Sequence, residues 1–250
     1  MKKAFGTFTA LIMIAAVCVG LAGCMIRFDS GMRIEGNGQV ETREISLPEA
    51  LSAVKTLTSI DVLLDPDLTD KAILEGESNI LDLTEVKVSA GVLTVNFKPA
   101  YSLSISRPVT LRVPELSGGL LETSSSGSIR MLGSDALKGE SFELVTSSSG
   151  SIAVAVETDK LRAVSSSSGS ITVTGSAETA NIELMSSGSF NGFDCAAQNV
   201  SARLSSSGDA KVRVSGELSG NISSSGNVVY TGNPSRVNVT TSSSGRAIEG

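Results

Sequence analysis

Serine is the residue whose type and spacing most suggest chemistry in this chain of 250 residues, because Ser-Ser-Gly occurs seven times. A serine hydroxyl becomes a nucleophile when a neighbouring base takes its proton. The chain contains no histidine, so a Ser-His-Asp triad cannot be built. Residues 52–55 match the Ser-x-x-Lys motif of penicillin-binding enzymes, but the companion motifs Ser-Asp-Asn and Lys-Thr-Gly are missing. We therefore predict that the serines bind or support rather than catalyse.

Carboxylates are a second candidate, since clustered carboxylates hydrolyse polysaccharides in many enzymes. Glu122, Glu143 and Glu183 precede three Ser-Ser-Gly turns at offsets of −5, −7 and −5 from the glycine. Because they do not share one position of the repeat, we interpret them as solvated surface charges. A carbohydrate-active β-helix enzyme is the weakest of the functional alternatives, and we expect no catalytic residue.

Metal ligands are sparse. Zinc favours cysteine and histidine, whereas calcium accepts carboxylate oxygens. The acidic run Asp61, Asp65, Asp67 and Asp70 could bind calcium weakly, but it lacks the glycine and terminal glutamate of an EF-hand loop. A turn around Pro66 is the competing interpretation, and the sequence leaves the choice open. We predict no cofactor and no dedicated metal site.

The sequence around Cys24 suggests attachment to a membrane. Lys2 and Lys3 precede an uncharged apolar stretch, residues 10–20, and Leu21-Ala22-Gly23-Cys24 follows it. This order is typical of a secretory signal, and its end resembles a bacterial lipobox. The resemblance implies cleavage between Gly23 and Cys24 and acylation of Cys24, which would anchor the protein to a membrane. An uncleaved membrane helix over residues 4–23 is the alternative.

The remaining chain is acidic. Without Lys2 and Lys3, 18 basic side chains remain against 26 acidic ones, which gives a net charge of −8. This balance argues against nucleic acid as a partner, because nucleic-acid binding requires basic patches. Cys195 would be the one remaining free thiol, and we expect it to be a small buried residue. Met25 after the lipobox suggests an exported protein in the outer membrane or on the cell surface.

The seven turns define a repeat. Their spacings are 23, 19, 19, 20, 18 and 19 residues. The glycines are Gly127, Gly150, Gly169, Gly188, Gly208, Gly226 and Gly245. The serines two positions earlier are Ser125, Ser148, Ser167, Ser186, Ser206, Ser224 and Ser243. Two residues after each glycine the chain is apolar, at Ile129, Ile152, Ile171, Phe190, Ala210, Val228 and Ala247. Six residues before, most repeats are apolar too, at Leu121, Leu144, Ala163, Ile182, Ala202 and Val239.

Apolar residues at alternate positions indicate strands with one buried face. A unit of about 19 residues cannot bury that face alone, but stacked units can. We therefore predict an all-β fold, a right-handed parallel β-helix or solenoid whose coils stack about 4.8 Å apart. Its turn serines would form ladders along one flat face, with hydroxyls that donate from one coil to the next. The glycine would supply either a positive φ or room for a close backbone approach. A flexible Ser-Gly linker would not keep its apolar positions in register, and a β-propeller blade is about twice as long.

Residues 41–119 lack the turn motif but still indicate strands, at residues 60–64, 86–88, 92–95 and 109–113. Residues 89–91 are typical of a hairpin turn, and residues 48–54 could form one helical turn. We predict an N-terminal β cap or irregular first coils here, followed by the solenoid over residues 120–250. Residues 24–40, with Gly31, Gly36 and Gly38, would be a flexible tether after the 1–23 signal peptide.

These features resemble the auto-transporter adhesins of the head GIN domain type, a family of bacterial envelope lipoproteins. The resemblance covers about residues 40–250, and its motifs are the spaced serine-glycine turns and Tyr230-Thr231-Gly232-Asn233-Pro234. Family repeats commonly read Ser-Gly-Ser-Gly-Asp, whereas this chain has aspartate after the glycine only at Asp209.

The resemblance implies a non-enzymatic, adhesin-like or scaffolding lipoprotein that binds a glycan or protein through a serine-rich face. The alternative is a periplasm-facing structural or signalling protein with the same fold. Open solenoid ends could also pair two copies into a homodimer.

Overall fold

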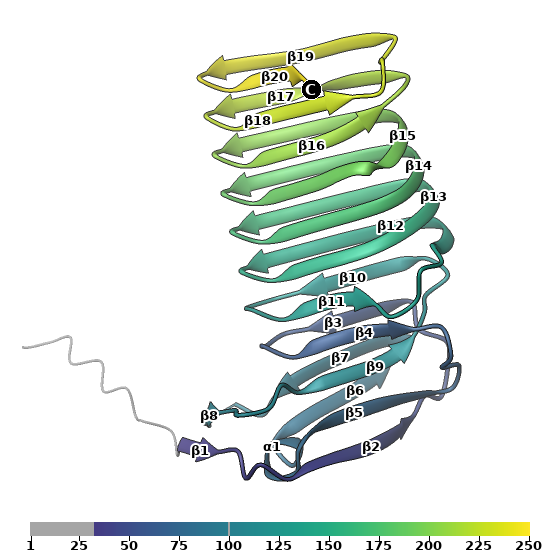
Figure 1. The fold of residues 1–250 in the computed structure, drawn as a ribbon, viewed down its shortest axis with the longest axis vertical. Coiled ribbons are helices and arrows are strands. Elements are labelled where there is room, and N and C mark those ends of the chain that lie inside the picture. The colour runs from purple at the N-terminus through teal and green to yellow at the C-terminus, as the bar shows by residue number, and fades with distance from the viewer. Residues whose placement is uncertain (1–32, 100) are drawn as a thin grey trace, which may run out of the picture.

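A computed structural model describes residues 33–99 and 101–250 (Figure 1). The proposed signal peptide, Gly23, Cys24 and the first part of the proposed tether lie outside these residues. Strands make up 69% of the described residues, and the parallel coils are about 19 residues apart, which confirms the β-solenoid. Among the described segments, no helix has the length and apolarity needed to span a bilayer.

The solenoid itself runs from β10 to β20. Three long strands each bend around a corner and contribute to both sides of a coil: β13 (Ser151–Ser167), β14 (Ser170–Ser186) and β15 (Ser189–Ser206). Before them come β10 (Gly119–Thr123), β11 (Ser128–Met131) and β12 (Leu137–Ser148). After them come β16 (Asp209–Val214), β17 (Glu217–Ser224), β18 (Asn227–Thr231), β19 (Arg236–Ser243) and β20 (Arg246–Glu249).

Each coil has two long sides, so the stack forms two sheets that face one another. We call the sheet that leads into the Ser-Ser-Gly turns the entry sheet; it contains β10, β17, β19 and the last parts of β12 to β15. The exit sheet, which leaves the turns, contains β11, β16, β18, β20 and the first parts of β13 to β15. All of these neighbours pair in parallel.

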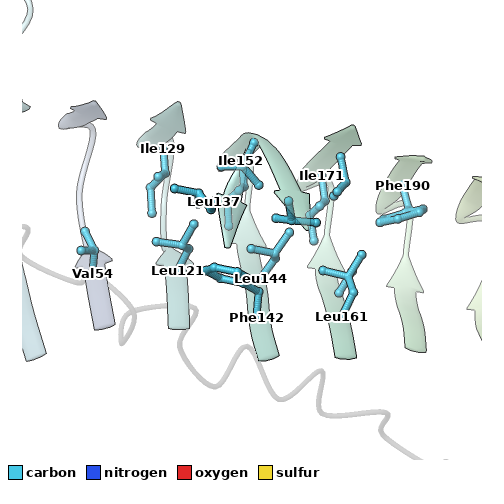
Figure 2. Close-up of a cluster of buried hydrophobic side chains, with 14 of the residues drawn as sticks. Val54, Leu121, Ile129, Leu137, Phe142, Leu144, Ile152, Leu161, Ile171 and Phe190 are labelled. Carbon is cyan, nitrogen blue, oxygen red and sulfur yellow. The ribbon is translucent and has the colours of Figure 1, made fainter. Parts of the chain in front are cut away.

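The register predicted from the repeat is confirmed. Ile129 pairs with Ile152, Ile152 with Ile171, and Ile171 with Phe190. On the entry sheet Leu121 pairs with Leu144. Figure 2 shows these side chains from neighbouring strands meeting between the sheets, where all of them are buried. Alternation at period two therefore produces a continuous apolar core, because every inward position stacks on its equivalent in the next coil.

The two coils nearest the N-terminus are stacked out of chain order. One is formed by β3 (Ala53–Thr56) and β4 (Asp61–Asp65), and the other by β7 (Val92–Phe97) and β9 (Thr110–Pro114). β3 pairs with β10 and β7, and β4 pairs with β11 and β9. The first coil in sequence thus lies inside the stack, and the later one lies beneath it.

An antiparallel cap closes this end of the stack. β6 (Thr84–Ser89) pairs with β7, while β5 (Lys71–Glu77) pairs with β9 and with β2 (Val40–Ser46), all antiparallel. The short helix α1 (Ser78–Leu81) joins β5 to β6 and buries Ile80 and Leu81. The hairpin predicted at residues 89–91 is present, with positive φ at Ala90 and Gly91. The region is therefore both cap and first coils.

Two expectations in this region are wrong. Residues 48–54 form no helical turn, because Ala53 and Val54 begin β3 and are held between β10 and β7. Residues 33–40 do not hang free as part of a tether. β1 (Arg33–Glu35) pairs in parallel with β8 (Ser102–Ser104), and Gly38 N donates to Glu77 Oε1 at 2.7 Å.

The side chain of Glu77, which is fully buried, holds these segments against the cap. Ser106 donates to it through its hydroxyl (2.7 Å) and its backbone N–H (3.0 Å), and Arg107 N–H adds a longer bond. The Ser106 hydroxyl above all, together with the backbone donors, lowers the pKa of Glu77 although burial opposes this. One buried carboxylate thus joins β5, the N-terminal segment and the loop before β9.

We predict that Glu77→Gln destabilises the protein in a pH-dependent way. Because folding lowers the pKa of Glu77 below its usual 4.5, the stabilisation is present above that pH and is lost as the pH falls through the lowered value. Urea unfolding at pH 7 should show a lower midpoint for the variant than for the wild type, and the gap should shrink below pH 4. The exposed carboxylate of Glu41, changed to Gln, is the control. An equal gap at both pH values would contradict the assignment.

Candidate functional site

The seven Ser-Ser-Gly turns lie above one another along one narrow edge of the solenoid, where the entry sheet passes into the exit sheet (Figure 1). We call the two serines of each turn, taken over all seven turns, the serine edge. The prediction of a flat serine-rich face is therefore wrong in its geometry. The serines occupy a ridge between two sheets, because the turn is only a few residues long and joins strands that belong to opposite sides.

Backbone hydrogen bonds hold successive turns together. Ser149 N donates to Ser125 O, and Ser168 N donates to Ser148 O, both at 3.0 Å. The residue after the glycine repeats the pattern, as Ser170 N donates to Gly150 O at 3.0 Å. The backbone of each turn is therefore hydrogen-bonded to the turn of the preceding coil.

The glycine is required for a close approach and not for a positive φ, which settles the choice that the sequence left open. A Cβ atom on Gly150 would lie 2.2 Å from Thr123 Oγ1, and one on Gly169 would lie 2.3 Å from Thr146 Oγ1. On Gly226 it would lie 2.4 Å from Gly208 O. The glycines are buried and leave no room for a side chain above the preceding coil.

The positive φ falls instead on the serine two residues before the glycine. All seven of these serines adopt it: Ser125, Ser148, Ser167, Ser186, Ser206, Ser224 and Ser243, with φ between 62° and 128°. An L-residue in the left-handed region costs roughly 1–2 kcal/mol, which glycine avoids. Every turn therefore has serine at a position where glycine would have the lower conformational free energy.

The hydroxyls of the serine edge point to solvent. Thirteen of its fourteen serines are exposed, and Ser206 is half-buried. The hydrogen bonds of the described chain use the hydroxyls just before the edge instead, such as Ser223 Oγ to Leu204 O at 3.2 Å. The predicted hydroxyl-to-hydroxyl ladder does not join these serines, since successive turns are joined through their backbones. Their donors and acceptors are available to a ligand.

A second column of hydroxyls, which the sequence analysis missed, lies inside the core. Thr56, Thr123, Thr146 and Ser165 occupy one inward position, four residues before the glycine where the turn has one, and all are fully buried. Thr146 donates to Ser165 Oγ at 2.9 Å, and Ser165 donates to Gly169 O at 3.0 Å. Thr123 Oγ1 has no partner among the described atoms. Extending the repeat alignment by one more inward position would have revealed the column.

The candidate catalytic carboxylates serve as ion-pair partners on the outer surface of the entry sheet. Arg162 bridges Glu143 at 2.6 Å and Glu183 at 3.0 Å. Glu122 pairs with Lys55 at 2.8 Å. They do not share one column, as expected from their offsets: Glu122 and Glu183 lie in the column of Val164, whereas Glu143 lies in the column of Arg162.

The acidic run is dispersed. Asp61 accepts from Ser128 Oγ at 2.6 Å, while Asp65 is buried and accepts from Arg112 Nε at 2.7 Å and from the backbone of Asp67. Within residues 33–99 and 101–250, no three acidic, cysteine or histidine side chains converge as a metal site would require. Asp65 therefore fixes the turn around Pro66.

Cys195 is buried in the core of β15, as expected. Burial raises the pKa of its thiol to about 11, so the thiol stays protonated at neutral pH and is a poor nucleophile. It sits opposite Gly175 of β14, where β15 carries one extra residue and its register shifts. Cys195 fills the widened coil as a small apolar residue.

These features define a class: a capped parallel β-solenoid with a column of positive-φ serines along one edge and its candidate carboxylates held in ion pairs. The chain belongs to the family described as "Putative auto-transporter adhesin, head GIN domain", whose family model matches residues 50–234. No curated protein matches it.

Solved structures of bacterial proteins share the fold. A putative adhesin from Bacteroides fragilis is 17% identical, with a TM-score of 0.71 over 86% of this chain and 99% of that one. A putative adhesin from Parabacteroides merdae is 20% identical, with a TM-score of 0.66 over 87% and 100%. A putative lipid binding protein from Parabacteroides distasonis is 26% identical, with a TM-score of 0.67 over 87% and 100%.

The turn geometry gives a paired prediction. Gly150→Ala should lower stability by about 1–3 kcal/mol, because the new methyl group overlaps Thr123. Ser148→Gly, two residues away, should be neutral or stabilise by up to about 1 kcal/mol, because relief of the positive φ exceeds the added freedom of the unfolded chain. Chemical denaturation measures both. A loss of stability for Ser148→Gly equal to that for Gly150→Ala would contradict the division of roles.

The internal hydroxyl column gives another prediction. Thr123→Val replaces a buried hydroxyl without a partner and should stabilise the protein by about 1 kcal/mol. Thr146→Val is the matched control, since it removes the donor to Ser165 and should destabilise by about 1 kcal/mol. Thermal unfolding of the two variants should therefore shift in opposite directions.

Proposed function

We propose that this protein is a non-enzymatic envelope protein that binds a glycan or glycoprotein partner through the serine edge. The observation that carries the proposal is the retention of serine at seven positions, six exposed and one half-buried, where the backbone favours glycine. A residue kept at a conformational cost, with its hydroxyl free, is better explained by an external contact than by folding.

The geometry suits a long, polar ligand. Neighbouring turns are about 4.8 Å apart, so the seven turns present a hydroxyl column of roughly 30 Å. Each hydroxyl is both a donor and an acceptor, and many weak bonds along one ridge add up when the partner spans several coils. The regular spacing would favour an extended chain over a compact small molecule.

Membership of an adhesin family and the fold shared with adhesins support this proposal. Side chains fill the space between the sheets, so we place ligand binding on the outside of the coils. For the same reason, the lipid that the Parabacteroides distasonis relative is named for would have to bind on the outer surface here.

Lipid anchoring at Cys24 and exposure on the outer membrane complete the proposal. The sequence motif at residues 21–24 supports them. The competing arrangement is the same fold facing the periplasm as a structural or signalling protein, which would leave the serine edge without access to an external partner.

The test removes hydroxyls without disturbing the turn. The triple variant Ser148→Gly, Ser167→Gly, Ser186→Gly should unfold at a midpoint no lower than that of the wild type but bind a mucin-coated surface at least tenfold more weakly. Ser141, Ser201 and Ser219, changed to alanine on the outer surface of the entry sheet, form the control triple. Equal mucin binding by all three proteins would refute the serine edge as the contact surface.

A protease treatment of intact and permeabilised cells distinguishes the two orientations in the same strain. Cleavage in intact cells is expected for an outward-facing protein. Protection until permeabilisation, with a periplasmic marker protected in parallel, would favour the periplasm-facing alternative and end the search for an external ligand.

A further inference from the structure

Opposite the cap, the solenoid has an end that no described strand covers, and we call it the open end. β19 and β20 form its last coil, and in the described chain each pairs on one side only, with β17 and β18 (Figure 1). The free side of β19 is an edge of eight residues. Such an edge carries backbone donors and acceptors that can pair with another strand.

The hydrogen bonds of this coil show which groups face outward from the edge. Arg236 N donates to Gly216 O, so the backbone groups of residue 236 and of every second residue after it point toward β17. The N–H and C=O groups of Val237, Val239 and Thr241 consequently point to the open side. On β20, Arg246 N donates to Gly226 O, which directs the groups of Ala247 to the open side in the same way.

The side chains at this end belong to the core. Val237, Val239 and Thr241 continue the inward columns of Leu218, Gly220 and Ile222 on the strand below. They lack a covering coil, so Val237 is 43% exposed. The open end is therefore a cross-section through the apolar core.

The capped end is built differently. Its outer strands are β2, which carries Glu41, Arg43 and Glu44, and β6, which carries Glu85 and Lys87. Charged side chains on an edge strand discourage pairing with another chain. Residues 237–243 of β19 contain neither a charge nor a proline, so this edge lacks the protection that the other end has.

We propose that the open end binds a second copy of this chain, so that two solenoids join end to end through β19. A two-fold axis through Val239 would place the two β19 strands antiparallel, with Val239 opposite itself and Val237 opposite Thr241 of the second copy. In this register the outward backbone groups of residues 237, 239 and 241 meet one another, and the inward side chains stay on the core side. On β19, Arg236 lies opposite Ser242 of the second copy, so no like charges are opposed on this strand, and the rods extend in opposite directions.

A second copy fits better than a head-to-tail filament. A filament would set β19 against the charged strands of the cap, whereas the two-fold arrangement pairs two copies of the uncharged stretch 237–243 and closes after two copies. The proposal does not depend on the serine edge, which remains exposed along both halves of the dimer.

The experiment is disulfide trapping with the full chain in cells. In the proposed register, residue 239 faces its own copy at a Cα separation of about 5.5 Å, within disulfide range. Val239→Cys should therefore give a reducible species of twice the mass, whereas wild type, with its buried Cys195, should not. Thr42→Cys, on the exposed β2 edge at the other end, is the matched control and should remain a monomer.

Light scattering of the purified full chain supplies a readout that does not depend on cysteine. Wild type and Val40→Lys at the capped end should show the same concentration-dependent dimer, and Val239→Lys should lose it at unchanged circular dichroism. Absence of the Val239→Cys species, its equal formation by Thr42→Cys, or a dimer retained in Val239→Lys would each overturn the proposal.

Discussion

The structure depends on how closely one turn can lie upon the next. At each Ser-Ser-Gly, the backbone of a coil rests on the previous turn so tightly that no Cβ fits at the glycine. This contact aligns the backbone hydrogen bonds of the turns, and the alignment in turn sets the register of both sheets. Because the strand period is two, a slip of one residue at a turn would expose the whole inward column. The glycine therefore governs the core, although it contributes no side chain to it.

Within each Ser-Ser-Gly tripeptide, the glycine makes the contact between coils and the two serines do not. The glycine faces inward and the serines face outward, so their hydroxyls are not needed to hold the coils together. The flat sheets beside the edge neutralise their own charges through pairs such as Arg162 with Glu143 and Glu183. Such exposed pairs add little stability, but they leave no unpaired carboxylate cluster at these positions for catalysis. The serine edge thus stands out as a polar surface whose hydroxyl groups have no hydrogen-bond partner within the described chain.

Any open stack of strands leaves unpaired backbone N–H and C=O groups at its two ends, and the two ends of this rod differ in how these groups are covered. At the N-terminal end the chain reverses direction. There β5 and β6 run antiparallel to the coil of β7 and β9, and the helix α1 between them buries Ile80 and Leu81. Glu77 secures that closure by accepting hydrogen bonds from two segments, the one around Gly38 and the loop of Ser106 and Arg107. At the opposite end the apolar core continues into the coil of β19 and β20. Because no described strand covers this coil, apolar side chains there are exposed.

The sequence by itself determined the solenoid, the coil length and the register, because an apolar residue at fixed offsets from each glycine can be satisfied only by stacking. It also determined that no histidine-dependent chemistry occurs. Tertiary structure alone decided the order of the first two coils, since β3 and β7 carry no turn motif and their pairing depends on long-range contacts. It also decided that residues 53–54 are strand rather than helix, because local propensity yields to pairing on both sides. Finally, only the fold could show that serine, and not glycine, takes the positive φ, since steric room at a turn depends on the coil beneath it.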